Sequence, residues 1–442
     1  MQGFPTIALL LLLLFVVMVE SSLKYGSFTV VDFGAVGDGK TDDSQAFQKA
    51  WKAVCESTSN GNSKLLVPEG KTFLLKSAVE FQGPCKSTSI NFQVSGNIIA
   101  PSWQNFGSGK GFWLAFSNID GLIINGDGVV DGNGSSWWSY CQKLMTLSSC
   151  TNLQVSGLRI RNAPRNHISV TNCDGATISH INITAPGTSP NTDGIDVSHS
   201  TKIRIQDSVI KTGDDCIAIN SGSSNIDITG VHCGPGHGIS IGSLGRGGSK
   251  AAVEEVHVSH CTFVETTNAA RIKTWKGGSG YARKISFTDI TLVGSMHPIF
   301  IDQYYNGAGT GPKVSSTSAV KISDVSFIGF TGTSASAVAI QLLCSETVGC
   351  TGLVLDQINI APSPRAGQNG ATASSKCINA HGTSSDSNVP KVSCLQDDVP
   401  SPPPSSHSKI LNTSSLDDGA SCIAPSDDNQ ASTKRPLNYT WL

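Results

Sequence analysis

The 442-residue sequence has few charged residues and no surplus of positive charge. Only 14% of its residues are Asp, Glu, Lys or Arg, and the formal net charge is -2. A chain without a basic surplus has no general attraction for nucleic acid, so we expect none as a partner, and affinity for an acidic ligand must come from a few local cations. The low charge and the 46 glycines favour a turn-rich β protein with a large core over a disordered chain.

Long apolar runs are missing except at the N-terminus. There an uninterrupted run from Ile7 to Val19 precedes Glu20-Ser21-Ser22. The run is too short to span a bilayer, and its flank of small residues is typical of a signal peptide. We therefore predict a signal peptide over 1–22, a secreted, extracellular product, and no membrane attachment after cleavage.

Zinc-type cysteine spacing is also missing, although the chain has 13 cysteines. An exported chain with many cysteines is expected to form disulfides, and an odd number leaves at least one thiol unpaired or intermolecular. Secretion is also compatible with four glycosylation sequons, at Asn133, Asn182, Asn412 and Asn438. The spacing suggests four local disulfide pairs: Cys141/Cys150, Cys216/Cys233, Cys344/Cys350 and Cys377/Cys394.

The sequence has little helical periodicity. One amphipathic helix is predicted over 43–55, after a short strand at 28–31. The chain then becomes a series of short β-type segments that end in Gly, Asn, Asp or Ser and recur roughly every 20 to 30 residues, a spacing typical of solenoid coils. These segments are 122–126, 153–157, 176–179, 203–206, 226–230, 256–259, 285–288 and 354–357.

Three segments share one template with a fixed offset. Asp193-Gly194-Ile195, Asp215-Cys216-Ile217 and His237-Gly238-Ile239 begin 22 residues apart, and Asn166-His167-Ile168 fits after a longer coil. Isoleucines at an equal offset stack into one internal ladder in a coiled β structure. If the first residue of each segment is to face solvent, a bend must separate it from the isoleucine.

The register predicts an all-β fold, a right-handed parallel β-helix over 23–395. The 43–55 helix would cap its first coil, and a Pro/Ser-rich tail over 396–442 would be mobile. A β-sandwich or jelly roll is the alternative, but it leaves the 22-residue offset unexplained.

The template brings ionisable side chains together on adjacent coils. Asp193, Asp214 and Asp215 would lie close to one another, with His237 one coil further along. Crowded carboxylates repel, so at least one should have a raised pKa and keep a proton that it can donate. A neighbouring imidazole can orient or tune that proton.

Two cations follow on the next coil. The alternation in Arg271-Ile272-Lys273 sends both charged side chains to one face of a strand, and Tyr305 comes later. Each residue alone has an ordinary structural explanation: Asp193 as a turn former, Asp214-Asp215 as a turn or a calcium site, and Tyr305 as packing. Their shared column favours a functional site instead.

Four motifs in order resemble those of the polygalacturonases, glycoside hydrolase family 28. They are Asn191-Thr192-Asp193-Gly194, Gly213-Asp214-Asp215-Cys216, Gly236-His237-Gly238 and Arg271-Ile272-Lys273. The start at 31–39 resembles the plant members, and the resemblance runs from about 28 to 394.

The resemblance implies inverting, metal-free hydrolysis of α-1,4-linked galacturonan in pectin by a monomeric protein of the plant cell wall, with no cofactor. It implies Asp214 as the general acid, Asp193 and Asp215 as the pair that activates water, and His237 as support for the acid. Inversion requires acid and base carboxyls about 6.5–9.5 Å apart. Substrate would bind to Asn191, Arg271, Lys273 and Tyr305. Tyr304-Tyr305-Asn306 departs from the usual plant pattern of Asn-Tyr-Cys.

Two alternatives stay open. A calcium-dependent pectate lyase also uses a β-helix, and a non-catalytic pectin-binding wall protein could descend from a hydrolase.

Overall fold

The computed structural model describes residues 26–58, 62–107, 111–138, 142–306, 319–364 and 372–398. The predicted signal peptide lies outside these ranges, as do the tail beyond Asp398, the sequons at Asn412 and Asn438, and Cys141 and Cys422. In the described part, no helix is long and apolar enough to cross a membrane.

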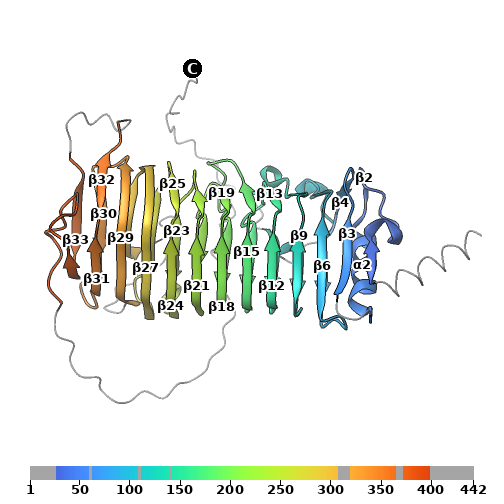
Figure 1. Cartoon of the computed structure of the whole chain (residues 1–442), viewed down its shortest axis with the longest axis horizontal. Helices are drawn as coiled ribbons and strands as arrows, with labels where there is room; N and C mark the ends of the chain where they lie inside the picture. Colours follow the sequence, from blue (N-terminus) through green and yellow to red (C-terminus); the bar gives the residue numbers. More distant parts are fainter. Residues whose placement is uncertain are drawn as a thin grey trace, which may run out of the picture.

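The described strands stack in parallel along one axis, as Figure 1 shows. They form a 23-stranded sheet and an 11-stranded sheet, and consecutive coils of the chain contribute strands to both. Parallel strands joined by crossovers are almost always connected with the right hand. The predicted right-handed parallel β-helix is therefore confirmed.

The smaller sheet carries the candidate site. Its strands are β5 (Val79–Gln82), β8 (Phe112–Ser117), β11 (Lys143–Ser148), β14 (Ile168–Thr171), β17 (Ile195–Ser198), β20 (Ile217–Ile219), β23 (Ile239–Leu244), β26 (Asn268–Trp275), β28 (His297–Tyr305), β30 (Val338–Leu343) and β33 (Ser374–Ile378).

The larger sheet contains the other described strands of the β-helix. Its first strands are β1 (Ser27–Thr29), β2 (Asp38–Asp42), β3 (Asn62–Val67), β4 (Thr72–Leu74), β6 (Ser89–Val94), β7 (Asn97–Ile99), β9 (Leu122–Asn125), β10 (Val129–Asp131), β12 (Thr151–Ser156), β13 (Arg159–Arg161), β15 (Asp174–Ser179) and β16 (Asn182–Thr184). Its later strands are β18 (Thr201–Gln206), β19 (Val209–Lys211), β21 (Ser223–Thr229), β22 (His232–Cys233), β24 (Lys250–Ser259), β25 (Thr262–Val264), β27 (Ser279–Ser295), β29 (Lys321–Ser334), β31 (Cys350–Asp356), β32 (Asn359–Pro362) and β34 (Ala380–Ser384). All eight β-type segments predicted from the sequence fall on strands of this sheet.

The 22-residue register is confirmed in the smaller sheet. Ile195 pairs with Ile217, and Ile217 pairs with Ile239, while Ile168 precedes them in the same ladder. All four side chains are fully buried, so they form a continuous column inside the coil. The stacked column fixes the height and rotation of each coil relative to the next.

The predicted N-terminal cap is confirmed as helix α2 (Ser44–Glu56), which lies at the end of the stack beside β3 in Figure 1. Its apolar face buries Phe47 and Trp51 against the first coils. The Trp51 indole packs edge-on against Phe81 and donates a hydrogen bond from Nε1 to the Gln82 carbonyl at 3.0 Å. The helix thereby covers apolar surface that an open coil would expose to water.

Two local predictions were wrong. The first strand ends at Thr29, because Thr29 and Asp32 cap each other's backbone N–H groups and turn Val30–Phe33 into a 3₁₀ helix. Cys150 forms no disulfide: it is a buried free thiol, as are Cys173 and Cys261.

The cysteine error has a structural cause. Cys150 lies inside the coil one residue before β12, where it stacks on Cys173 of the next coil. The other three predicted pairs are present, together with Cys55–Cys85.

Candidate active site

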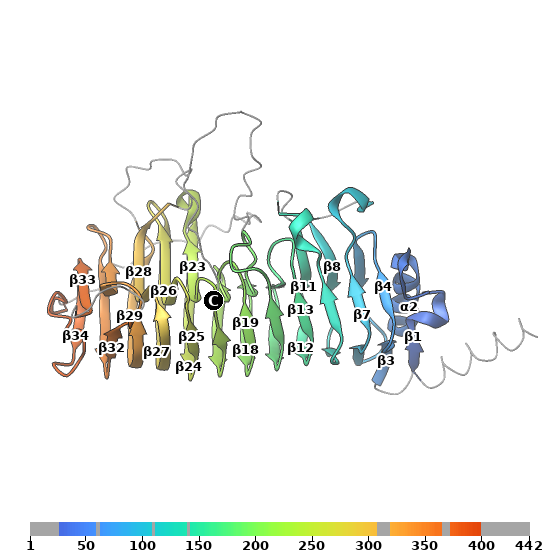
Figure 2. The ribbon, with the colours of Figure 1, turned by 90° about the horizontal axis from the view of Figure 1, so that it is seen from above.

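The candidate site lies on the outer face of the smaller sheet, where β17, β20, β23 and β26 are neighbours in that order. Figure 2 shows β23 beside β26. The chain bends at Gly194 and at Cys216, between each acidic residue and the isoleucine that starts the strand. In a regular strand, an aspartate two residues before an isoleucine would face the same side as that isoleucine, so a bend between them is required. These bends let the carboxyls of Asp193 and Asp215 lie outside the coil while Ile195 and Ile217 stay inside.

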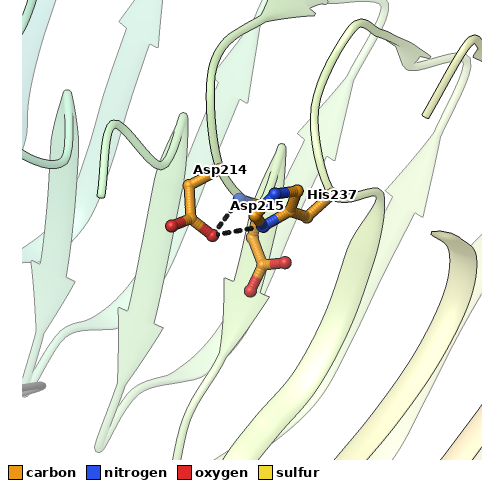
Figure 3. Close-up of side chains that lie close together, drawn as sticks. All are labelled: Asp214, Asp215 and His237. Atoms are coloured by element: carbon orange, nitrogen blue, oxygen red, sulfur yellow. Dashed lines mark hydrogen bonds and ion pairs between the residues drawn. The ribbon is translucent and has the colours of Figure 1, made fainter. Parts of the chain in front are cut away.

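Asp214 and His237 form a hydrogen-bonded pair. The His237 Nδ1 lies 2.8 Å from Oδ1 of Asp214, and the same oxygen accepts the backbone N–H of Asp215 at 2.8 Å. Figure 3 shows Asp214 turned toward the His237 ring, whereas the Asp215 carboxylate points away from this pair. The two adjacent acids are therefore held in different surroundings.

The contact between Asp214 and His237 shifts the pKa of each side chain toward its charged form. Burial acts to raise the pKa of Asp214, but the hydrogen bond from His237 and the charges of His237 and Lys273 outweigh it and hold that pKa below its usual range. The hydrogen bond to Asp214 raises the pKa of His237. Between about pH 4 and 6.5, these two directions favour an ionised Asp214 and a protonated His237.

Asp215 lies in a buried cage of donors. Its side chain is only 1% exposed. Lys273 Nζ donates to Oδ2 at 2.7 Å, Ser240 Oγ donates to Oδ1 at 2.8 Å, and the Arg271 guanidinium lies 3.6 Å from Oδ1. The hydrogen bonds from Lys273 and Ser240 therefore occupy both carboxylate oxygens of Asp215.

Asp193 has the raised pKa that crowding of acids predicts. Burial contributes most, followed by the charges of Asp214, Asp196 and Asp215, and together they place the pKa of Asp193 well above its ordinary value. Its backbone is fixed by His167, whose N–H and Nδ1–H both donate to the Asp193 carbonyl, at 2.8 and 2.9 Å. Burial lowers the pKa of His167 to about 4, so this imidazole is neutral at neutral pH.

The predicted substrate-binding residues divide into two groups. Arg271 and Lys273 lie against Asp215, and Tyr305 lies beside them, with both cations 5.5 Å from the centre of its ring. Trp275 packs edge-on against the same ring at 5.2 Å. Asn191 is exposed at the turn before Asp193, with a left-handed φ of 52°.

Tyr304 and Tyr305 have distinct surroundings. The Tyr304 hydroxyl donates a hydrogen bond to the Cys344 carbonyl at 3.0 Å, so its partner is the protein backbone. Tyr305 instead packs on the cations that contact Asp215. The structure thus brings Tyr305, Arg271, Lys273, His237, Asp214 and Asp215 together, while Asn191 lies at the edge.

Sequence reasoning missed two polar residues at the site. Ser240 bonds Asp215, and Asp196 accepts the Asn166 amide at 2.7 Å, with its pKa raised to about 6 mainly by burial. Both occupy the position after the stacked isoleucine, which faces outward on every coil. The alternation of inward and outward side chains along each strand could have identified both residues, because Arg271 occupies the same outward position on the next strand.

Asp214, Asp215 and His237 are also the described residues that could hold a metal ion, since their ligand atoms lie within 4.8 Å of one another. However, both Asp215 oxygens already accept hydrogen bonds from Lys273 and Ser240, and Nδ1 of His237 binds Asp214. Calcium prefers six to eight oxygen ligands. The donor set therefore fits proton transfer beside protein cations better than it fits calcium.

A hollow of about 430 Å³ lies on the larger sheet and is lined by residues of β12, β15, β18 and β21. None of the predicted site residues lines it. We place the chemistry at the aspartates because acids, imidazole and cations converge there.

Comparison with known proteins identifies the family of the chain. The model of glycosyl hydrolases family 28 matches residues 55–389. The chain belongs to this family. It is 50% identical over 371 residues to a protein named probable polygalacturonase from Arabidopsis thaliana, covering 83% of this chain and 80% of that one. It is 43% identical over 365 residues to a polygalacturonase of Persea americana, covering 79% and 76%.

Two solved structures share the fold. An endo-xylogalacturonan hydrolase from Aspergillus tubingensis superposes with a TM-score of 0.67 at 25% identity, covering 82% of this chain and all of that one. A polygalacturonase from Erwinia carotovora gives a TM-score of 0.64 at 21% identity, covering 81% and 96%. The second likeness concerns the fold alone.

Proposed function

We propose that this family 28 protein is a polygalacturonase that hydrolyses α-1,4-galacturonosyl links of pectin with inversion of configuration. The observation that carries the proposal is the contact of a buried carboxylate, Asp215, with two cations that also face the substrate side of the sheet. A neutral sugar needs no such cations, whereas each unit of galacturonan carries a carboxylate that Arg and Lys bind well.

Asp214 supplies the proton to the leaving oxygen, with His237 as its partner. The two side chains are in contact at 2.8 Å, and between about pH 4 and 6.5 the imidazole is the protonated partner. Galacturonan brings negative charge to the site, and a nearby negative charge favours the protonated form of a carboxyl. Substrate binding therefore moves the proton toward Asp214, where general acid catalysis needs it.

Asp193 and Asp215 orient and deprotonate the attacking water. Asp193 has a raised pKa and acts as the neutral member, while Asp215, whose two oxygens accept hydrogen bonds from Lys273 and Ser240, acts as the base. A substrate carboxylate that binds Lys273 competes with Asp215 for the ammonium, so that Oδ2 of Asp215 becomes free to accept a proton from the water. The water oxygen then bonds to the anomeric carbon, its proton passes to Asp215, and the glycosidic C–O bond breaks as Asp214 protonates the leaving oxygen.

Secretion to the plant cell wall is part of the proposal, since pectin is a wall polymer and the sequence begins with a signal-like segment. A monomeric active unit is also part of the proposal. Asn191, at the exposed turn, would contact a sugar at the edge of the site.

The test is incubation of the purified protein with polygalacturonate in the presence of a chelator. New reducing ends without unsaturated products are expected. Loss of activity with calcium removal, or unsaturated products, would indicate a pectate lyase. Binding without new reducing ends would indicate a non-catalytic wall protein.

A further inference from the structure

The outward row of the smaller sheet continues beyond the catalytic coils. One residue after each stacked aliphatic residue faces out, and the Cα partners in this row run from Ser240 to Arg271, then to Phe300 and Gln341. Ile299 and Ile301 on either side of Phe300 are fully buried in the coil. Phe300 therefore faces the same side as Arg271, one strand further from the aspartates.

Phe300 is the aromatic member of a row that is otherwise small or polar among the described residues. The complete row is Glu80, Ala115, Thr146, Ser169, Asp196, Ala218, Ser240, Arg271, Phe300, Gln341 and Lys376. Phe300 is only partly buried. An outward aromatic beside a site that binds a polymer offers a broad apolar contact surface.

Neighbouring groups hold the Phe300 ring in place. The His297 ring lies 5.6 Å from it, tilted by 42°. The Gln341 side-chain amide lies 2.9 Å from Nδ1 of His297, which ties the next coil to this cluster. Burial lowers the pKa of His297, so the imidazole is neutral at neutral pH. The resulting surface is uncharged and polar at its rim.

This surface complements the part of a galacturonate unit that the cations do not bind. A pyranose ring has a face of C–H groups, which packs against an aromatic ring, and hydroxyls that hydrogen-bond amides and imidazoles. Neighbouring strands lie about 4.8 Å apart, so Phe300 is one step along the polymer from Arg271 if the polymer runs across the coils.

We propose that Phe300 is a substrate-binding residue that stacks on the galacturonate unit next to the one held by Arg271 and Lys273, on the side away from the aspartates. The proposal rests on the polygalacturonase function above. It assigns His297 and Gln341 as positioning residues that orient the ring.

The experiment compares Phe300→Leu with Phe300→Tyr on galacturonate oligomers of increasing length. Loss of the ring face in Phe300→Leu should raise KM about tenfold for oligomers long enough to reach this unit, with a much smaller effect on kcat. Phe300→Tyr keeps the ring and should retain most of the affinity. For the shortest oligomers that are cut, all three proteins should have similar KM values.

The matched control is Val354→Ala, an apolar truncation at an exposed position of β31 on the larger sheet. Equal KM for Phe300→Leu and wild type on long oligomers would overturn the proposal, as would an equal rise on the shortest oligomers. Calorimetric binding of the same oligomers is measured in parallel. If the wild type binds but does not cut, the polygalacturonase function fails, while the Leu-to-Tyr difference in affinity still decides the role of Phe300.

Discussion

Lys273 Nζ lies 2.7 Å from Oδ2 of Asp215, although the two residues are 58 positions apart in the chain. The side chains are 9% and 1% exposed, so neither charge is well solvated. The contact exists because the coils that carry β20, β23 and β26 stack in register. It joins the residue that we propose as the base to one that we propose binds substrate.

The buried pair leads to a stability prediction. Lys273→Met leaves the buried Asp215 carboxylate with Arg271 as its neighbouring cation and Ser240 as a neutral donor. Breaking a buried ion pair in this way should cost about 3–5 kcal/mol of unfolding free energy. Asp215→Asn combined with Lys273→Met should recover part of this loss. Urea unfolding of the four proteins of this cycle measures the coupling.

The control for this cycle is the exposed pair Lys202–Asp174, with an N–O distance of 3.0 Å. Lys202→Met should change the free energy of unfolding by less than about 1 kcal/mol, because solvent screens this pair. A similar loss at both pairs would show that burial of the Lys273–Asp215 pair does not set its strength.

Asp214→Asn tests the acid. The variant should lose about 10²–10⁴-fold in kcat, because general acid catalysis contributes that much, while oligomer binding persists. Calorimetric affinity and initial rates measure the two effects separately. A rate near that of the wild type would remove Asp214 from the role of acid.

The Asp214–His237 pair predicts a pH dependence of stability. The pKa of His237 is raised above 6.5, so its contribution is full below pH 6.5 and is lost as pH rises through the raised value. The pKa of Asp214 is lowered below 3.8, so its contribution is full above pH 3.8 and is lost as pH falls through the lowered value.

The pair should therefore stabilise the fold most between about pH 4 and 6.5. Thermal unfolding of wild type and His237→Gln across pH measures this window. The difference in Tm should be largest near pH 5 and should shrink above neutrality. A difference that stays constant with pH would mean that the imidazole contributes by packing rather than by charge.

Two disulfides with equal sequence separation offer a controlled comparison. Cys216–Cys233 and Cys377–Cys394 each join residues 17 positions apart, but only Cys216 adjoins Asp215. Replacing either pair by alanines should cost about 3 kcal/mol from the lost loop constraint. Only the first replacement should reduce kcat strongly. Equal losses of activity would show that overall stability, rather than placement of the acids, explains the effect.

The sequence predicted the fold from its repeat. Few folds other than a β-helix stack identical aliphatic residues at a constant offset. The spacing alone therefore implied the ladder of Ile195, Ile217 and Ile239 and the convergence of the acids with His237. The bends after Asp193 and Asp215 could be required but not located, because they depend on local backbone angles at Gly194 and Cys216.

The distribution of protons could not be inferred from spacing. Crowding predicts that some carboxyl keeps a raised pKa, but which one depends on individual hydrogen bonds. The His237 imidazole favours the ionised form of Asp214, so the raised pKa belongs to Asp193. The Cys150 error has the same origin: spacing in sequence does not say whether a side chain faces the interior or the loops.

The stacked ladder separates the parts of the molecule that must stay constant from those that can vary. The coil from β14 to β17 is longer than the two that follow, yet Ile168, Ile195 and Ile217 remain in one column. Extra residues between strands leave the height of each coil unchanged. Segments that connect the coils could therefore be lengthened or exchanged between relatives to alter which polymers are admitted, while the acids keep their mutual positions.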